Sequence, residues 1–274
     1  GTYQLFQETY HQKTYGAMHK GPKADFERQL FAHDRAMAAG IDDVGLGVLY
    51  GLYDYKFDTL ALVSHSQYLD RKYNVGPHTI SVPRVQSAPT VDIPSTYEVS
   101  EDELLKSISI LRMAVPYTGM IITTRERPEI RAKAFQIGIS QTSAGSRTYP
   151  GGYGKENGSA QQFFLQDHRS LDAVLGSILE EGLMPSFCTA CYRLNRTGEK
   201  IMGWLKSGEI HNLCRPNAIL TFKEYLEDYA TNEMKDAGSL IIEKYMGQIT
   251  DDKIKSETLA RLGRIERGER DLYF

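Results

Sequence analysis

Several features that would assign a chain to a common class of protein are scarce or missing in this sequence. Its 274 residues contain only three cysteines, which excludes a small disulfide-rich scaffold and favours a reducing compartment. No apolar run approaches the roughly 20 residues that span a membrane, and the first residues lack a signal-peptide pattern. We therefore expect a cytoplasmic protein with no membrane partner.

Two further absences limit the binding functions that we expect. The net charge is only −3 at pH 7, so no overall positive field attracts nucleic acid, and no nucleic-acid partner is predicted. Neither a Gly-x-Gly-x-x-Gly fingerprint after the first strand nor a Walker phosphate-binding loop is present. The sequence thus lacks both of these nucleotide-binding signatures.

Residues 1–184 alternate short apolar segments with amphipathic ones. The predicted strands are Thr2–Phe6, Asp43–Tyr50, Thr79–Pro83, Gly119–Thr123 and Gln136–Ser140, and the predicted helices are Lys23–Ala39, Lys56–Tyr73, Glu101–Val115, Glu129–Phe135 and Leu171–Glu181. Ser100 with Glu103 forms a capping-box pattern before the third of these helices. Apolar strands joined by helical crossovers pair in parallel, so the pattern predicts an α/β fold.

Two α/β architectures fit this alternation: a doubly wound sheet and part of a β/α barrel. Both place ligands at the carboxyl ends of the strands, so the polar loops there decide only weakly between them. We favour an incomplete barrel for residues 1–184, because the first strand has no preceding sequence to pair with it. The glycine-rich segment Tyr149–Ser159 predicts a flexible loop.

The alternation ends beyond Pro185, and residues 185–274 predict a smaller, mainly helical domain. Helices are expected near Phe222–Lys235 and through Lys244–Gly263. All three cysteines of the chain lie near the start of this domain, in the segment Phe187–Asn217. Their spacing is Cys-x2-Cys-x22-Cys, with Cys188, Cys191 and Cys214.

Thiolates that converge on one point bind a soft metal ion or an iron–sulfur cluster, and nearby arginines favour the thiolate form. Together with His211, the three cysteines would form a Cys3His zinc site of structural type. Without His211 they would leave one iron of a cubane open to an external ligand. Spacing alone leaves these two readings open, and both explain the shared neighbourhood better than buried apolar cysteines or a disulfide.

Polar side chains at the ends of the predicted strands are candidate ligand-binding groups. Glu8 and Arg28 could hold an amine, ribose hydroxyls or a carboxylate, although a surface helix pair is the simpler reading. Arg125, with Thr142 and Ser143, could hold another carboxylate or serve only to cap a loop. His78 precedes a strand, so it should lie at the opposite edge of the sheet.

Several stretches together resemble one family over essentially the whole chain. They include FQETYH, GPHTISVPR, TTRERPEIR, FCTACYR and the final RDLYF, and they look like HydG-type radical-SAM tyrosine lyases (the 2-iminoacetate synthase family) of FeFe-hydrogenase maturation. The most specific feature is the cysteine spacing, which separates this family from its thiamine-pathway relatives. Asn195 stands where the family pattern usually has glycine.

The resemblance implies a (β/α)8 TIM barrel, a C-terminal iron–sulfur domain and two 4Fe-4S clusters. One cluster, on a Cys-x3-Cys-x2-Cys loop, reduces S-adenosyl-L-methionine to a radical that cleaves tyrosine to p-cresol and dehydroglycine. The auxiliary cluster carries an additional labile iron, where CO and cyanide made from dehydroglycine are bound for the H-cluster. No Cys-x3-Cys-x2-Cys occurs here, so we expect a C-terminal part of such an enzyme that is inactive in the radical step by itself.

The resemblance also implies partners and candidate site residues. The expected partners are tyrosine and other hydrogenase maturation proteins, and the unpaired edges of a partial barrel predict self-association. The alternative is a structural zinc module on an α/β domain without catalysis. Carried over residue by residue, the family implies metal ligands Cys188, Cys191, Cys214 and (in preference to His65) His78, S-adenosylmethionine contacts Glu8 and Arg28, and tyrosine contacts Arg125, Thr142 and Ser143.

Overall fold

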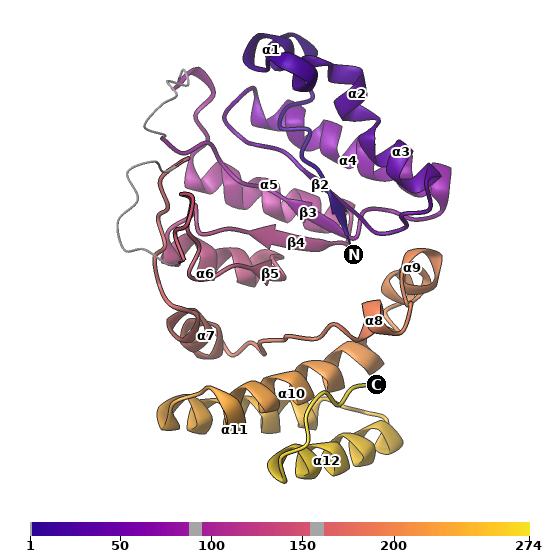
Figure 1. Ribbon diagram of the computed structural model, residues 1–274, viewed down its shortest axis with the longest axis vertical. Coiled ribbons are helices and arrows are strands. Elements are labelled where there is room, and N and C mark those ends of the chain that lie inside the picture. Colours follow the sequence, from indigo (N-terminus) through magenta and orange to yellow (C-terminus); the bar gives the residue numbers. More distant parts are fainter. Residues whose placement is uncertain (1, 88–94, 154–161) are drawn as a thin grey trace. The chain divides into compact units, whose positions relative to one another are not determined.

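The computed structural model describes residues 2–87, 95–153 and 162–274 of the chain (Figure 1). Contacts divide the chain into two compact units, Gly1–His168 and Arg169–Phe274. Helix α7 (Leu171–Glu180) contacts α11 (Asn232–Gly247) within the second unit. The division into functional domains after residue 184 remains a prediction. Of the predicted Tyr149–Ser159 loop, residues 154–159 lie outside the described residues.

The first unit contains a sheet of five parallel strands in the order β1-β2-β3-β4-β5. Because crossovers between parallel strands are right-handed, strands added in sequence order place their helices on one face, as in a barrel wall. A doubly wound sheet would instead reverse its order at a switch point. The strand order therefore confirms the predicted partial barrel. The strands are β1 (Tyr3–Gln4), β2 (Val44–Gly47), β3 (Thr79–Ser81), β4 (Gly119–Ile122) and β5 (Gln141–Thr142).

Helices connect these strands and bury the sheet. Strand β2 is fully buried, and Leu46 packs in one apolar cluster with Ile80 of β3 and with Leu62 and Leu104 from the helices. The predicted capping box is present: Ser100 accepts a hydrogen bond from the Glu103 amide, and the Glu103 carboxylate accepts one from the Ser100 amide. The helices of this unit are α1 (Gln12–Met18), η1 (Gly21–Ala24), α2 (Phe26–Leu30), α3 (Ala32–Ala38), α4 (Tyr55–Tyr73), η2 (Ser95–Tyr97), α5 (Glu101–Ala114) and α6 (Pro128–Ile137).

Two sequence predictions for this unit were wrong in detail. The expected strand Gln136–Ser140 begins inside α6, which ends at Ile137 with Gly138 as its C-cap, and β5 follows only at Gln141–Thr142. Gly138 has φ +142°, and Arg112 donates hydrogen bonds to its carbonyl, so the helix stops there. The single helix expected over Lys23–Ala39 is interrupted at Asp25 and again at Phe31.

The second unit is helical, as predicted. Its core joins Leu175, Phe222 and Ile242 from three different helices. The helix expected near Phe222–Lys235 was misplaced, because Thr231 caps a new helix by accepting a hydrogen bond from the Met234 amide. The elements are α7, α8 (Ala190–Arg193), α9 (Gly198–Ser207), α10 (His211–Asp228), α11 and α12 (Asp252–Glu266).

None of the helices within the described ranges is both long enough and apolar enough to cross a membrane.

A buried carboxylate ties the loop after β1 to helix α4. Asp58 is fully buried, and its Oδ1 accepts hydrogen bonds from the Tyr10 amide at 2.7 Å and the Thr9 hydroxyl at 3.1 Å. Its Oδ2 has no hydrogen-bond partner among the described residues. Burial raises the pKa of Asp58 to about 6, although the two hydrogen bonds oppose the shift.

We predict that this carboxylate makes the fold less stable as the pH rises. The pKa in the folded chain lies above the ordinary value of 3.8, so stability from this group is fully present below that value and is lost as the pH rises through about 6. A shift of this size corresponds to about 3 kcal/mol at neutral pH. Asp58→Asn should remove that part of the pH dependence of urea unfolding between about pH 4 and 7.

Asp25→Asn is the matched control, because Asp25 is an exposed N-cap, of α2 in the same unit, and asparagine also caps helices. Equal pH dependence in the wild type and Asp58→Asn would contradict the prediction.

Candidate functional site

Glu8 lies at the carboxyl end of β1, where its backbone pairs with Val48 after β2. Its φ of +67° is unusual for a residue other than glycine. Burial by itself would raise the pKa of Glu8, but hydrogen bonds from Lys23 and His19 outweigh it and hold the pKa below its ordinary value. Glu8 is therefore an ionised carboxylate held in a strained backbone position, as is common at ligand sites.

Arg28 does not lie with Glu8 in a single polar pair. It is an exposed residue of α2, where its amide donates to the Asp25 cap and its carbonyl accepts from Arg35. The structure shows no ion pair between Arg28 and Glu8 in the part of the chain that it describes. Lys23 takes that position instead.

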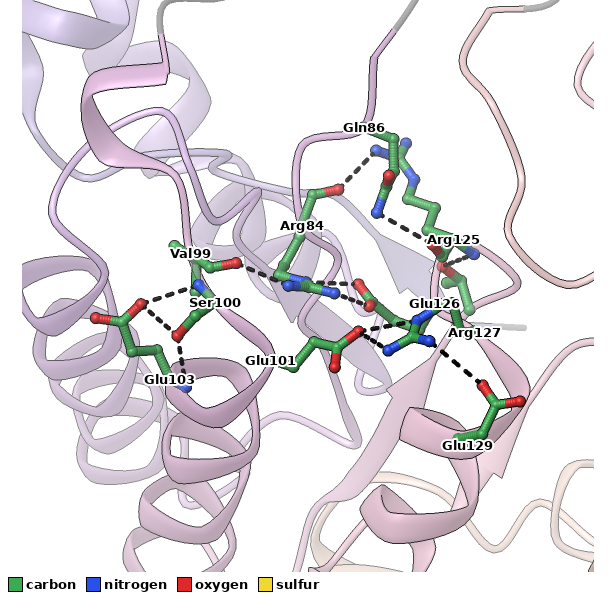
Figure 2. A network of polar contacts seen from close by, with 11 residues as sticks. Arg84, Gln86, Val99, Ser100, Glu101, Glu103, Arg125, Glu126, Arg127 and Glu129 are labelled. Atoms are coloured by element: carbon green, nitrogen blue, oxygen red, sulfur yellow. Dashed lines mark hydrogen bonds and ion pairs between the residues drawn. The ribbon is translucent and has the colours of Figure 1, made fainter.

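A buried ion pair connects the loops that follow β3 and β4 (Figure 2). Arg84 Nε donates to Glu126 Oε1 at 3.0 Å, and its Nη2 donates to the second carboxylate oxygen. A third bond runs from Arg84 Nη1 to the Val99 carbonyl at 2.7 Å. Glu126 is 1% exposed, so this bidentate ion pair is shielded from water and holds the two loops together. The sequence analysis did not predict this pairing.

Arg125 lies beside this pair, and its guanidinium has a different environment. The group stacks 3.6 Å from the Phe163 ring centroid, and its Nη1 reaches the Arg84 carbonyl at 3.4 Å. Burial lowers the pKa of Arg125, while the negative charges of Glu126 and Glu8 oppose that shift. No carboxylate forms an ion pair with Arg125 within the described ranges, so its charge is available to an anionic ligand.

Thr142 and Ser143 contact Arg131, which the sequence analysis did not identify. Arg131 Nη2 donates to Thr142 Oγ1 at 2.6 Å and also to the Ser143 carbonyl. Its Nη1 pairs with Asp167, and both members of this pair are buried. Arg131 thus holds β5 and the segment near residue 167 together. The only available signal was a basic residue on the buried face of α6.

His78 lies at the opposite edge of the sheet from these groups, as expected. Its amide donates to the Val44 carbonyl and its carbonyl accepts from the Gly119 amide, both at 2.8 Å, so it lies directly before β3 and is bonded to the segments on both sides. The residue is half-buried. The structure therefore brings Glu8 and Arg125 to one edge, groups Thr142 and Ser143 around Arg131, and leaves Arg28 and His78 elsewhere.

The three cysteines of the second unit come from two elements. Cys191 lies on the short helix α8, Cys188 directly precedes it, and Cys214 lies on α10. The Ala190 amide donates to Cys188 Sγ at 3.4 Å. Desolvation raises the pKa of Cys214 to about 11, although the residue as a whole is exposed, and the other two sulfurs add to the shift. The three sulfurs are thus close enough to influence one another's charge.

Throughout the described residues, no three His, Cys, Asp or Glu side chains are gathered closely enough to hold one metal ion. The three cysteines thus provide candidate thiolate ligands, but they do not form a preassembled single-ion site. His211 is an exposed residue at the start of α10.

Asn195 has φ +49°, in the left-handed region. It follows α8, and the next amide, that of Arg196, donates to the Cys191 carbonyl at 2.8 Å. Glycine adopts such a conformation without cost, and asparagine tolerates it better than most residues do. The substitution relative to the family pattern therefore keeps the turn that follows the first two cysteines.

Comparisons with known proteins agree with this geometry. Residues 81–184 match the Biotin and Thiamin Synthesis associated domain. This match, the sequential parallel sheet and the helical unit agree with the C-terminal part of a radical-SAM fold followed by a helical domain. A 2-iminoacetate synthase from Escherichia coli (strain K12) is 35% identical over 183 residues, which are 66% of this chain and 48% of that protein.

The more specific likeness is to HydG. A crystal structure of HydG, a maturase of the [FeFe]-hydrogenase, has a TM-score of 0.96 and 54% identity, and the match covers 100% of this chain and 60% of that chain. HydG from Carboxydothermus hydrogenoformans has a TM-score of 0.79 and 38% identity, with coverage of 96% and 57%. The chain is therefore HydG-like, which confirms the resemblance drawn from the sequence. It spans about half the length of the 2-iminoacetate synthase that it matches.

We predict that removing the Arg131 charge destabilises the first unit far more than removing a surface charge. Arg131→Met leaves the buried Asp167 carboxylate without its partner, and breaking a buried pair in this way costs about 3–5 kcal/mol. Arg127→Met is the control, since Arg127 pairs with Glu101 on the surface, where such pairs contribute about 1 kcal/mol or less. Urea unfolding measures both, and similar losses in the two variants would disprove the prediction.

Proposed function

We propose that this chain provides the last strands of the barrel and the auxiliary-cluster domain of a radical-SAM carbon–carbon lyase that cleaves tyrosine for [FeFe]-hydrogenase maturation. The likeness to HydG over the whole chain, at 54% identity, is the observation that carries this proposal. The radical step needs S-adenosylmethionine and a second 4Fe-4S cluster, whose cysteine loop this sequence does not contain. The chain by itself should therefore not start the reaction.

Cys188, Cys191 and Cys214 would hold the auxiliary 4Fe-4S cluster. The support is their Cys-x2-Cys-x22-Cys spacing and the amide hydrogen bond to Cys188 Sγ, which stabilises a thiolate. When bound, the cluster and an additional labile iron supply the metal at which CO and cyanide are held. His78 is proposed as the protein ligand of that iron, because imidazole is a common iron ligand and the side chain is half-buried.

Arg125 is proposed to receive the carboxylate of tyrosine. Its guanidinium lies at the ligand-binding edge of the sheet and is stacked on Phe163, without an ion pair to a carboxylate of the described chain. A planar guanidinium fits a carboxylate through two parallel hydrogen bonds. Thr142 and Ser143 complete the proposed site, in a position that Arg131 fixes.

Glu8 and Arg28 are proposed to contact S-adenosylmethionine. The ionised Glu8 suits an ammonium group or ribose hydroxyls, and its present partner Lys23 is half-exposed, so a ligand cation can replace it. Arg28 has the weaker support, because it lies exposed on α2. A change in this helix on ligand binding would be needed to bring the two residues together.

The setting and partners follow from the same proposal. Three free thiols suit a cytoplasmic location, and other hydrogenase maturation proteins would receive the product. Strands β1 and β5 each pair with a single neighbour in the described sheet, so we propose that the isolated chain associates with itself through these edges.

Metal analysis of the chain, reconstituted without oxygen, tests the cluster. We expect about four irons with labile sulfide per chain, because a cubane contains four of each. Cys191→Ser should lose most of this iron, whereas Ser207→Ala, on the exposed end of α9, should keep it. One zinc ion without sulfide would refute the cluster and support the structural zinc module.

Tyrosine binding tests the role of Arg125. Loss of a charge-assisted hydrogen bond costs about 1.5–3 kcal/mol, so Arg125→Ala should weaken L-tyrosine binding by roughly 10- to 100-fold. Tyramine lacks the carboxylate, and its binding should change little. Arg127→Ala is the control variant, since that arginine is exposed and pairs with Glu101. Calorimetry that finds equal affinity for tyrosine in the wild type and Arg125→Ala would contradict the assignment.

A further inference from the structure

The last residues of the chain lie along the helix that carries Cys214. We call Arg270–Phe274 the strap. At its beginning, the Arg270 guanidinium donates two parallel hydrogen bonds to Asp228, at 2.8 and 2.6 Å, near the carboxyl end of α10. At its end, the Phe274 amide donates to the buried side chain of Asn217 at 2.7 Å. Asn217 is three residues beyond Cys214, about one helical turn away.

Between these ends, the strap stays on the same helix. Glu224 Oε1 accepts the amides of Asp271 at 2.7 Å and Leu272 at 3.2 Å. The partners on α10 thus run from Asp228 back to Asn217 as the strap advances, over about 16 Å of helix. An extended strap covers nearly that length, at about 3.4 Å per residue. The strap therefore runs antiparallel to α10 and is anchored at both ends and in the middle.

The strap also contacts the element that carries the other two cysteines. Arg193, on α8, forms an ion pair with Asp271, and its guanidinium lies 5.6 Å from the centroid of the Tyr273 ring. The contact with Asp271 raises the pKa of Arg193. Asp271 has φ +67°, so its backbone is held in a sparsely populated conformation at the point of contact.

A cavity of about 410 Å³ lies between these elements. The strap and α10 line it with Asp271, Leu272 and Glu224. Residues 181–193, which we call the cysteine arm, line it with Cys188 and Arg193. Residues 181–189 of this arm have no helix or strand. Their contacts with the helices include hydrogen bonds from the Phe187 amide to Thr221 Oγ1 at 3.2 Å and from the Met184 amide to the Tyr245 hydroxyl, and stacking of Phe187 on Tyr225. The ion pair across the cavity adds a link between α8, next to the first two cysteines, and the strap.

We propose that the strap positions the Cys188–Cys191 arm relative to Cys214, so that the three thiols are placed before a cluster forms. This inference rests on the proposed cluster site. Twenty-two residues separate Cys191 from Cys214, and ordering such a segment costs conformational entropy that any bound group would otherwise have to offset. Arg193 and Asp271 are positioning residues in this scheme, because neither supplies a metal ligand.

Two variants on opposite sides of the cavity test this role. Arg193→Gln and Asp271→Asn each remove the ion pair, and asparagine tolerates the positive φ at position 271. Each should speed the loss of iron to a chelator from the reconstituted chain about threefold, within the range that an exposed ion pair supports. The double variant should be no faster than the single ones, because both changes break the same contact.

Arg264→Gln is the matched control. It breaks a comparable exposed ion pair, with Glu269, at the end of α12, and this pair does not contact α8. Its iron loss should match the wild type, as should the thermal unfolding of all the variants. Equal iron loss in the wild type and Asp271→Asn would overturn the proposal. Faster loss in Arg264→Gln as well would also overturn it, by showing a general effect of charge.

Amide hydrogen exchange in the metal-free chain separates this inference from the cluster assignment. In Asp271→Asn, peptides over residues 186–196 should exchange about threefold faster, and those in Arg264→Gln should not. Faster exchange in a chain that takes up no iron and sulfide would support the strap and refute the proposed cluster. Unchanged exchange in a chain that holds a normal cluster would refute the strap alone.

Discussion

Parallel pairing of consecutive strands is the constraint on which the first unit depends. Strands that run in the same direction all end at one edge, so the loops that follow them meet there whatever their separation in sequence. In this chain the edge collects Glu8, Arg84 and Arg125 from the ends of β1, β3 and β4. The sequential order of the strands also keeps the crossover helices on one face, which leaves this edge open to a ligand.

Buried ion pairs then decide which charges at this edge are already used. Arg84 with Glu126, and Arg131 with Asp167, are each desolvated and paired, so removal of one partner would leave a costly buried charge. Their function here is to hold loops and β5 in place. Arg125 differs, because an aromatic ring and a carbonyl are its contacts instead of a carboxylate. Among the described residues, the Arg125 guanidinium therefore has no carboxylate partner, whereas those of Arg84 and Arg131 do.

The second unit takes its three thiols from a segment without regular structure, from the short helix α8 and from the long helix α10. Helix α10 packs in an apolar core with α7 and α11. The strap contacts both α10 and α8, and so joins the two helices that carry Cys191 and Cys214. Within the described residues, these thiols are not gathered around a single point.

What the sequence alone determined were the features that depend on neighbouring residues. The capping box at Ser100, most of α4 and α5, and the grouping of the three cysteines follow from spacing over a few positions. The predicted strand over Gln136–Ser140 was wrong because its local signal fits two structures. Ile137 and Ile139 alternate as in a strand, yet Gly138 ends a helix there. The tertiary structure decided the rest, namely that Arg131 and not Arg125 contacts Thr142, that Arg28 stays exposed, and that Arg193 meets Asp271. Such pairs join residues far apart in the chain, and only the packing of whole elements selects which charges meet.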